Sequence, residues 1–250
     1  VDDTIYIRGR DRITRLHDLN GNGEADFYEN FYEEPDEIGA SYHAFIYDLQ
    51  TDRAGNFYFS QSGYKSPLTG GVVKVSPDGK SAEFVGTDLR NPNGMGAGGP
   101  NDWVTITDNP SGKEVYNGFF LAKKGAKYGY ENSRTVPMLV RLPASVDSSS
   151  GGQCWSHAEK WGPLSGTVIH TSYSRCSAFY CFIQDIEPYP NGFAVRFPFD
   201  LESGAMRPRL HPIDNQVYIT CHKGWDTTAP LDGVIYRVRH AEEDMVGVCD

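Results

Sequence analysis

The sequence lacks the local signatures that identify several protein classes. No apolar run approaches the roughly 20 residues of a membrane-spanning helix, and no long segment shows a capped repeat of about 3.6 residues. Phosphate-cradling loops, G-x-S-x-G and H-E-x-x-H are also missing. The five cysteines form neither C-x-x-C nor C-x-x-C-H, which argues against a structural zinc site or a covalently bound haem.

An excess of basic residues is missing as well. The chain has 23 Lys and Arg against 33 Asp and Glu, a formal net charge of −10. This balance excludes nucleic acid as the main partner, because binding phosphates needs a basic surface. An acidic surface instead suits neutral or cationic ligands, bound Ca²⁺ or solubility alone.

The composition that is present favours many short strands. The 250 residues include 27 Gly and 15 Pro, which suit turns, and 15 Tyr and 13 Phe, which favour strands. Cys176 and Cys181 flank a short apolar stretch and could form a disulfide, so the cysteines favour an oxidising, extracytoplasmic compartment, periplasmic or secreted. The chain begins at Val1 almost directly in a strand-like run, which indicates a segment of a longer protein.

A short pattern recurs along the chain: a turn with Asp, Asn or Gly, a β-rich run, and a small or polar residue. Its markers are Ile5, Phe57, Val104, Val168 and Val217. Their spacing of roughly 50 residues is that of a propeller blade with four strands. We therefore expect residues 1–250 to form a single all-β domain, a β-propeller with five or six blades. A two-sheet sandwich is the alternative.

The spaces between the markers fit this reading. Residues 71–76 and 81–85 flank a Pro-Asp-Gly turn and predict a hairpin, and 233–239 alternates as a strand does. The interval between the third and fourth markers is the longest. It contains 144–153, a segment rich in Ser and Gly that reads as an inserted loop.

The sharpest local motif is a nine-residue loop with oxygen-bearing side chains at alternate positions. It offers Ca²⁺ the hard oxygen ligands that this ion prefers, from Asp18, Asn20, Asn22, the Glu24 carbonyl and Asp26. Glu29 nearly matches the closing ligand of an EF-hand, but strand-like flanks argue against the helices of that motif. The alternative is an Asn-Gly turn without metal, and a bound Ca²⁺ would staple the loop rather than take part in chemistry.

Several polar residues fall near the ends of predicted inner strands and could meet at the mouth of a central channel. His43 could remove a hydroxyl proton. Arg90 and Asn91 could contact an anionic or carbonyl-bearing ligand. Lys223 and Trp225 could line the same mouth, as could the segment 207–211. The alternatives are a His bonded to a neighbouring loop, an ordinary Asn-Pro-Asn-Gly turn, and a Trp in common packing.

Taken together, these segments resemble the soluble pyrroloquinoline-quinone-dependent sugar dehydrogenases. The resemblance is greater still to the propeller domain of large secreted "membrane-bound dehydrogenase" proteins, which are often fused to a cytochrome c module. Each segment is short, so the order and spacing carry the specificity. The resembling segments are 12–26, 43–52, 89–94, 124–129, 160–163 and 236–239.

The resemblance implies a quinone held over Ca²⁺ at the mouth of a six-bladed propeller. It implies that His43 acts as general base on the sugar hydroxyl and that Arg90 and Asn91 contact the quinone. The turn that begins at Asp108 takes the place of the family's catalytic Ca²⁺ site, but its residues differ from the family's pattern.

Two main functions follow as expectations. The first is a quinone- and Ca²⁺-dependent oxidoreductase acting on a sugar or other alcohol, with a cytochrome c as possible electron acceptor. The second is a non-catalytic propeller that binds a carbohydrate or a protein and is stabilised by Ca²⁺. A purely structural module is a third reading, because the propeller fold alone hosts many functions.

Overall fold

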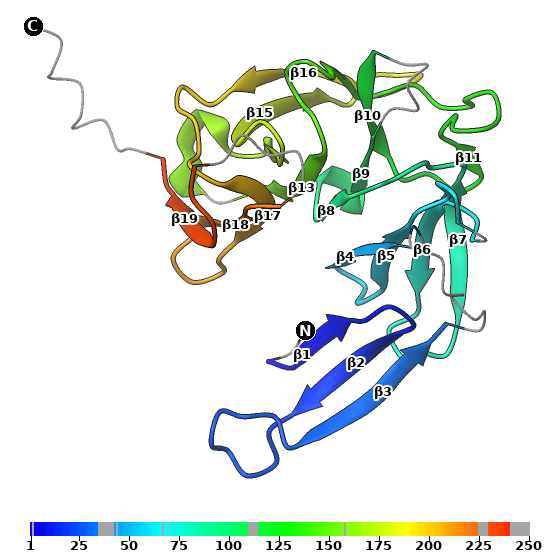
Figure 1. The fold of residues 1–250 in the computed structure, drawn as a ribbon, viewed down its shortest axis with the longest axis vertical. Helices are drawn as coiled ribbons and strands as arrows, with labels where there is room; N and C mark the ends of the chain where they lie inside the picture. The colour runs from blue at the N-terminus through cyan, green and yellow to red at the C-terminus, as the bar shows by residue number, and fades with distance from the viewer. Residues whose placement is uncertain are drawn as a thin grey trace, which may run out of the picture.

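The computed structural model describes residues 1, 3–34, 43, 45–66, 68–109, 115–157, 159–224 and 230–240. Within them the secondary structure is nearly all β, with only two short 3₁₀ helices, η1 (Pro100–Asp102) and η2 (Glu159–Leu164). The strands form five sheets, numbered here in chain order. Figure 1 shows the sheets arranged around a common centre, with sheet 1 and sheet 5 at the two ends of the series.

The first two sheets hold the N-terminal strands. Sheet 1 has the order β1-β2-β3, with β1 (Ile5–Arg8), β2 (Arg12–His17) and β3 (Phe27–Glu33). Sheet 2 has the order β11-β7-β6-β5-β4, with β4 (Ile46–Thr51), β5 (Phe57–Gln61), β6 (Gly71–Val75), β7 (Ala82–Thr87) and β11 (Ala126–Lys127). The predicted hairpin at 71–85 is the antiparallel pair β6–β7.

The other three sheets have four, four and three strands. Sheet 3 has the order β12-β10-β9-β8, with β8 (Gly94–Ala97), β9 (Val104–Asp108), β10 (Tyr116–Leu121) and β12 (Val140–Pro143). Sheet 4 runs β13 (Ser150–Trp155), β14 (Val168–Ser172), β15 (Ser177–Gln184) and β16 (Asn191–Arg196). Sheet 5 runs β17 (Gly204–Leu210), β18 (Val217–His222) and β19 (Val234–Val238).

The sheets are the blades of a β-propeller. Strands β4, β8, β13 and β17 begin sheets 2 to 5, and they are the inner strands, because β8 contacts both β4 and β13 and β13 contacts β17. The predicted propeller is therefore confirmed, with five blades. Four of the five markers, Phe57, Val104, Val168 and Val217, lie in the second strands β5, β9, β14 and β18, so the repeat marks the same strand of successive blades.

Four apolar clusters fill the spaces between successive blades, as blade-on-blade packing requires. Phe59 of sheet 2 packs with Ile13 of sheet 1, and Ile106 of sheet 3 packs in a second cluster with Val72 of sheet 2. Sheets 3 and 4 share a third cluster, and sheets 4 and 5 share a fourth around Ile169 and Ile219. Ile13, Ile106, Ile169 and Ile219 are all fully buried, so they anchor the cores between blades 1 and 2, 2 and 3, and 4 and 5.

The prediction of an inserted loop at 144–153 is wrong in its second half. Residues from Ser150 onward form β13, which is buried throughout. The small residues allow close approach of two inner strands, because a Cβ on Gly94 of β8 would lie 1.5 Å from the carbonyl oxygen of Gly151. The long marker interval instead contains β11, which pairs in parallel with β7 and so adds a strand to sheet 2.

The cysteines within the described residues are all buried free thiols, so the disulfide considered between Cys176 and Cys181 is not formed. Burial raises the pKa of the Cys154 thiol to about 12. Cys249 lies outside the described residues. The cysteines therefore act as small apolar core residues and say nothing about the compartment.

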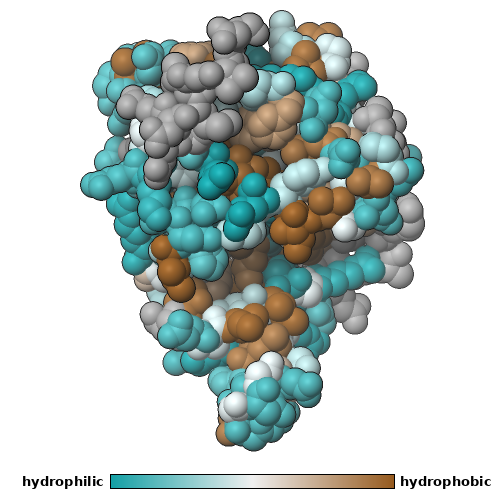
Figure 2. All heavy atoms as spheres, turned by 90° about the vertical axis from the view of Figure 1, so that its left-hand side faces the viewer, coloured by the Kyte–Doolittle hydropathy of each residue, from teal (hydrophilic) through white to brown (hydrophobic). Residues whose placement is uncertain are grey.

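Figure 2 shows the face of the molecule that lies on the left in Figure 1. Apolar side chains are exposed across the middle of this face. Exposed apolar side chains include Ile5 and Ile7 on β1 and Ile235 on β19. Among the described residues, no helix has the length and apolar character needed to cross a membrane.

Candidate functional site

The predicted site residues gather at one end of the propeller, named here the mouth. The mouth is the end where the inner strands begin and the second strands finish, as the pairs Gly94 with Thr107 and Gly204 with His222 show. His43 precedes β4, Arg90 and Asn91 precede β8, and Lys223 follows β18. The antiparallel connections of the blades therefore bring these four residues to the same end.

His43 and Arg90 are linked by the ring of Tyr64, which follows β5. The rings of His43 and Tyr64 are 5.0 Å apart in an edge-to-face arrangement. The guanidinium carbon of Arg90 lies 4.2 Å from the centre of the same Tyr64 ring, in a cation–π geometry. One tyrosine thus holds both a potential base and a permanent cation at the rim of the mouth.

Asp108, at the end of β9, organises the loop that carries Arg90 and Asn91. Its carboxylate oxygens accept the backbone N–H groups of Arg90 at 2.8 Å and Asn91 at 2.7 Å. Burial raises the pKa of Asp108 to about 7, although these N–H groups and the charge of Arg90 oppose the rise. Both carboxylate oxygens of Asp108 are thus turned toward the loop that carries Arg90 and Asn91.

Tyr47 connects this loop to the inner strand of sheet 2. Its hydroxyl donates a hydrogen bond of 2.7 Å to Oδ1 of Asn91. Burial raises the pKa of Tyr47 far above its ordinary value, so this phenol stays protonated and remains a donor. The side-chain amide of Asn91 is thereby held in one orientation.

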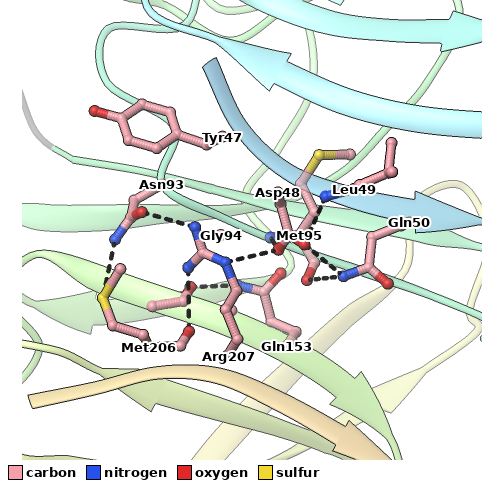
Figure 3. Close-up of polar contacts among 12 residues, drawn as sticks. Tyr47, Asp48, Leu49, Gln50, Asn93, Gly94, Met95, Gln153, Met206 and Arg207 are labelled. Carbon is pink, nitrogen blue, oxygen red and sulfur yellow. Dashed lines mark hydrogen bonds and ion pairs between the residues drawn. The ribbon is translucent and has the colours of Figure 1, made fainter. Parts of the chain in front are cut away.

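Below the rim, four polar residues form a network named here the channel floor: Asp48, Asn93, Arg207 and Arg209. Oδ1 of Asp48 lies 2.7 Å from Nη2 of Arg209, and Oδ2 lies 3.5 Å from Nε of Arg207. Nη2 of Arg207 donates to Oδ1 of Asn93 at 3.1 Å. Figure 3 shows Arg207 between Asn93 on one side and Asp48 on the other.

The side chain of Asp48 is only 1% exposed, yet it remains ionised. The backbone of Asp48 adopts a positive φ of 57°. Its carboxylate also accepts the N–H of Leu49 at 2.8 Å and the N–H of Met95 at 3.2 Å. Burial alone would raise the pKa of Asp48, but the charges of Arg207 and Arg209 and these hydrogen bonds hold it below its ordinary value. One carboxylate faces two guanidiniums, so the floor keeps a positive charge.

The channel floor joins blades that are not neighbours. Asp48 lies on sheet 2, Asn93 directly before β8 of sheet 3, and both arginines on β17 of sheet 5. Nδ2 of Asn93 also donates to the carbonyl of Ser150 on sheet 4 at 2.9 Å. The network therefore ties four blades together at the centre of the propeller.

The nine-residue loop connects β2 and β3 and lies at the far end of sheet 1, away from the centre (Figure 1). Asp18 accepts the backbone N–H groups of Gly21 at 2.7 Å and of Gly23 at 2.8 Å. Asp26 accepts the N–H of Leu19 at 3.0 Å and the side-chain amide of Asn20 at 2.8 Å. These bonds fold the loop and fix the orientation of its oxygens.

The donor set of this loop suits Ca²⁺. Two carboxylates, the amide oxygens of Asn20 and Asn22 and a backbone carbonyl are all hard ligands, although Oδ1 of Asp18 and Oδ2 of Asp26 each already accept two backbone N–H groups. Glu29 does not complete the set, because Oε2 lies 2.7 Å from Nε2 of His17. Among the described residues no group of three or more His, Cys, Asp or Glu is gathered around a metal position, so any cation here depends on amide and carbonyl oxygens.

The other residues predicted at the mouth form no hydrogen bond or ion pair with His43, Arg90 or Asn91 in the described part of the chain. Lys223 is exposed, and its backbone N–H donates to Asp232 at 2.7 Å. Trp225 lies outside the described residues. His211 is turned away into its own loop, where Nδ1 lies 3.2 Å from Asp214. The structure thus gathers His43, Arg90 and Asn91 closely, and it places Lys223 on the same rim without a hydrogen bond or ion pair to them in the described part of the chain.

Sequence reasoning missed Tyr47, Asp48 and Tyr64. The signal for Asp48 was present, because it is a lone acid inside an otherwise apolar and aromatic run on an inner strand. Nothing local identifies its partners, however, since Arg209 follows 161 residues later.

Comparisons with known proteins agree on the fold. No protein-family model matches the chain, and no curated protein matches it in sequence. Solved structures do match. A glucose dehydrogenase aligns with a TM-score of 0.69 at 12% identity, over 95% of this chain and 76% of that one.

Two further solved structures are aldose sugar dehydrogenases. The soluble enzyme from Escherichia coli, in its apo form, aligns with a TM-score of 0.65 at 10% identity, over 87% of this chain and 74% of its own. The PQQ-bound enzyme from Streptomyces coelicolor aligns with a TM-score of 0.66 at 13% identity, over 94% and 74%. The resemblance predicted from the sequence is thus confirmed for the fold.

Proposed function

We propose that the chain is an oxidoreductase that oxidises a sugar or other alcohol at the mouth of the propeller, with pyrroloquinoline quinone as hydride acceptor. The observation that carries the proposal is the meeting of His43 and Arg90 on the ring of Tyr64, above a positively charged channel floor. The fold that holds this arrangement is that of solved glucose and aldose sugar dehydrogenases.

The residues at the mouth fit such a quinone, which is planar and carries carbonyl and carboxylate groups. Arg90 and Asn91 lie on one loop, and Arg207 and Arg209 supply guanidinium groups from the opposite blade. Two guanidiniums that share a single carboxylate retain attraction for a further anion. We propose that Lys223 and Trp225 complete the rim on the side of sheet 5.

The reaction would use each of these side chains differently. His43 would accept the proton of the substrate hydroxyl as general base, which typically contributes 10²–10⁴-fold to a rate. When bound, the quinone would supply the hydride acceptor. Arg90, held against Tyr64, would orient the quinone carbonyls and stabilise the negative charge that develops on them. Tyr47 would keep the Asn91 amide in the orientation that the site needs.

We propose a separate, structural role for the loop from Asp18 to Asp26. Its oxygen donors would bind Ca²⁺ at the far end of sheet 1 and rigidify the β2–β3 connection. A Ca²⁺ that acts as Lewis acid on the quinone would need ligands at the mouth, where the Asp108 carboxylate is already engaged by two backbone N–H groups.

Reconstitution tests the proposed activity. The protein is incubated with pyrroloquinoline quinone and Ca²⁺, freed of excess quinone, and assayed for dye reduction with aldoses and simple alcohols. We expect retained quinone absorbance at micromolar concentrations and substrate-dependent dye reduction. The absence of any retained quinone would reject the enzymatic reading.

A non-catalytic carbohydrate- or protein-binding propeller is the second candidate, and one observation favours it. The guanidinium of Arg207 is engaged on three sides within the protein, by Asp48, by Asn93 and by the carbonyl of Met206 at 3.1 Å. A site of this kind would bind sugar without quinone and without dye reduction. For either function we propose an extracytoplasmic location, and for the enzyme a cytochrome c as electron acceptor.

A further inference from the structure

Five Asn-Gly pairs occur in the chain, with the asparagines Asn20, Asn22, Asn93, Asn117 and Asn191. Asparagine is among the thermolabile residues. In such a pair the backbone nitrogen of the glycine can attack the side-chain carbonyl carbon of the asparagine, because glycine has no Cβ to hinder the approach. A C–N bond forms, ammonia leaves, and water opens the cyclic imide to aspartate or isoaspartate. Water is the only other reactant, so the fold decides which pair reacts.

Burial closes two of the five pairs to this reaction. Asn117 is 1% exposed and Asn93 is 9% exposed. Their glycines lie in β10 and β8, where pairing with β9 fixes the backbone on both sides. Neither the entry of water nor the change of backbone that the cyclic imide requires is available at these positions.

The pair at Asn191 is exposed, but it belongs to a strand. Asn191 and Gly192 begin β16. The N–H of Gly192 donates to the carbonyl of Leu139 at 2.8 Å. Because this nitrogen is engaged by a neighbouring segment, it is not free to attack its own side chain, and we expect the pair to react slowly.

The other two pairs lie in the exposed β2–β3 loop and differ at the leaving group. Nδ2 of Asn20 donates to Oδ1 of Asp26 at 2.8 Å, which keeps this amide nitrogen in place. Nδ2 of Asn22 forms no hydrogen bond within the described part of the chain. The space beside it is open, since a Cβ on Gly23 would meet nothing within 4 Å. Ammonia can therefore leave, and water can enter, more readily at Asn22 than at the other four asparagines.

Asp18 restrains the attacking nitrogens of both loop pairs. Its Oδ1 accepts the N–H of Gly21 at 2.7 Å, and its Oδ2 accepts the N–H of Gly23 at 2.8 Å. The attacking nitrogen must lose its proton, and a hydrogen bond to an ionised carboxylate, which is stronger than one to a neutral acceptor, holds that proton in place. The carboxylate of Asp18 therefore slows the reaction at Asn22 without blocking access to it.

We infer that Asn22 is a modification site, where this chain deamidates first and at a rate that Asp18 limits. Either product carries a carboxylate in place of the amide and makes the loop more negative. Additional carboxylate ligands tighten Ca²⁺ binding, so the aspartate product should bind Ca²⁺ more strongly. This consequence rests on the Ca²⁺ role proposed for the loop, whereas the reactivity of Asn22 does not.

Peptide mapping by mass spectrometry tests the order of reaction. The folded protein is kept at mildly alkaline pH with a chelator that removes Ca²⁺. We expect deamidation at Asn22 before Asn20 and Asn191, and none at Asn93 or Asn117. The urea-unfolded chain is the reference, in which all five pairs should react at similar rates. A folded chain in which Asn191 reacts first, or in which Asn22 stays as intact as Asn117, would overturn the inference.

Substitution of Asp18 tests the restraint. Asp18→Ala should speed deamidation at Asn22 at least about tenfold, the factor that one hydrogen bond to a charged group is worth, and leave Asn191 unchanged. Asp18→Asn keeps one acceptor oxygen and should give a smaller increase. Asp26→Ala is the matched control, because it loosens the same loop without freeing the N–H of Gly23. Equal acceleration at Asn22 by Asp18→Ala and Asp26→Ala would overturn the role given to Asp18.

A Ca²⁺ titration of Asn22→Asp, followed by thermal unfolding, tests the consequence. We expect Ca²⁺ to raise the melting temperature of this variant at lower concentrations than it does for the native chain. If neither protein responds to Ca²⁺, the proposed Ca²⁺ role of the loop is rejected, and the peptide map alone decides the inference about Asn22.

Discussion

The carboxylate of Asp48 on β4 lies 2.7 Å from Nη2 of Arg209 on β17, which joins the inner strands of blades 2 and 5. The same carboxylate lies 3.5 Å from Nε of Arg207. The arginine side chains are 22% and 45% exposed, whereas that of Asp48 is almost completely buried. The carboxylate is therefore shielded from solvent by the two arginines. The ion pairs connect blade 2 to blade 5 at the channel floor.

Removing Asp48 should destabilise the protein strongly. Asp48→Ala leaves Arg207 and Arg209 without their carboxylate, and breaking one side of a buried pair typically costs about 3–5 kcal/mol. Urea unfolding followed by tryptophan fluorescence measures the loss. Glu83→Ala is the control, because it removes an exposed pair with Lys124 and should cost less than about 1 kcal/mol. Similar losses for both variants would contradict the role given to Asp48.

The buried pair of Asp147 and His170 predicts sensitivity to acid. Nε2 of His170 lies 3.0 Å from Oδ2 of Asp147, and both side chains are fully buried. Burial raises the pKa of Asp147, but the charge of His170 and hydrogen bonds from His170, Ser150 and Ser172 outweigh it and hold the pKa below its ordinary value.

A carboxyl with a lowered pKa stabilises the fold above the unfolded-state pKa of about 4, and the stabilisation disappears as the pH falls further. The free energy of unfolding of the native chain should therefore exceed that of Asp147→Asn by more at pH 6 than at pH 3. Urea titrations of both proteins at these two pH values measure the difference. A gap that widens toward pH 3 would show that Asp147 is not held ionised by His170.

Gly94 should tolerate no side chain. Its Cβ would lie 1.5 Å from the carbonyl oxygen of Gly151, so Gly94→Ala must push the inner strands of blades 3 and 4 apart. We expect a loss of at least about 1–3 kcal/mol, as for other overpacked cores. Gly9→Ala is the control, because its nearest neighbour would be a carbonyl oxygen at 3.6 Å. Thermal unfolding distinguishes the two, and equal melting temperatures would refute the close approach.

Calcium should stabilise the protein through the β2–β3 loop without serving the chemistry at the mouth. We expect Ca²⁺ to raise the melting temperature, and Asp18→Ala to abolish that rise. Asp78→Ala is a matched control, because Asp78 forms a similar exposed turn between β6 and β7, with its carboxylate accepting the N–H of Lys80 at 3.1 Å. A Ca²⁺ effect that survives Asp18→Ala would place the cation elsewhere.

The sequence predicted the blades better than the centre. The second strands were found because Phe57, Val104 and Val217 combine β-rich runs with turn residues, which are local signals. The inner strand β13 was read as a loop because of Gly151 and Gly152. Close approach of neighbouring inner strands demands these small residues, so the packing that builds the centre removes the signal that would reveal it.

The candidate site divides in the same way. His43, Arg90 and Asn91 were selected by their position relative to the repeat, and the structure brings them to one end of the propeller. Their interpretation as catalytic and cofactor-binding groups remains a proposal. The ion pairs of Asp48 could not be predicted, because their partners are set by the closure of the blades around the centre and not by any local pattern.

The measurement that tests the central claim most directly is dye reduction by the reconstituted protein, compared between the native chain and His43→Ala. With pyrroloquinoline quinone, Ca²⁺ and a sugar or alcohol present, we expect the native chain to reduce the dye and His43→Ala to do so at least about 100-fold more slowly, with retained quinone absorbance. A native chain that holds no quinone, or a His43→Ala variant that matches its rate, would contradict the claim.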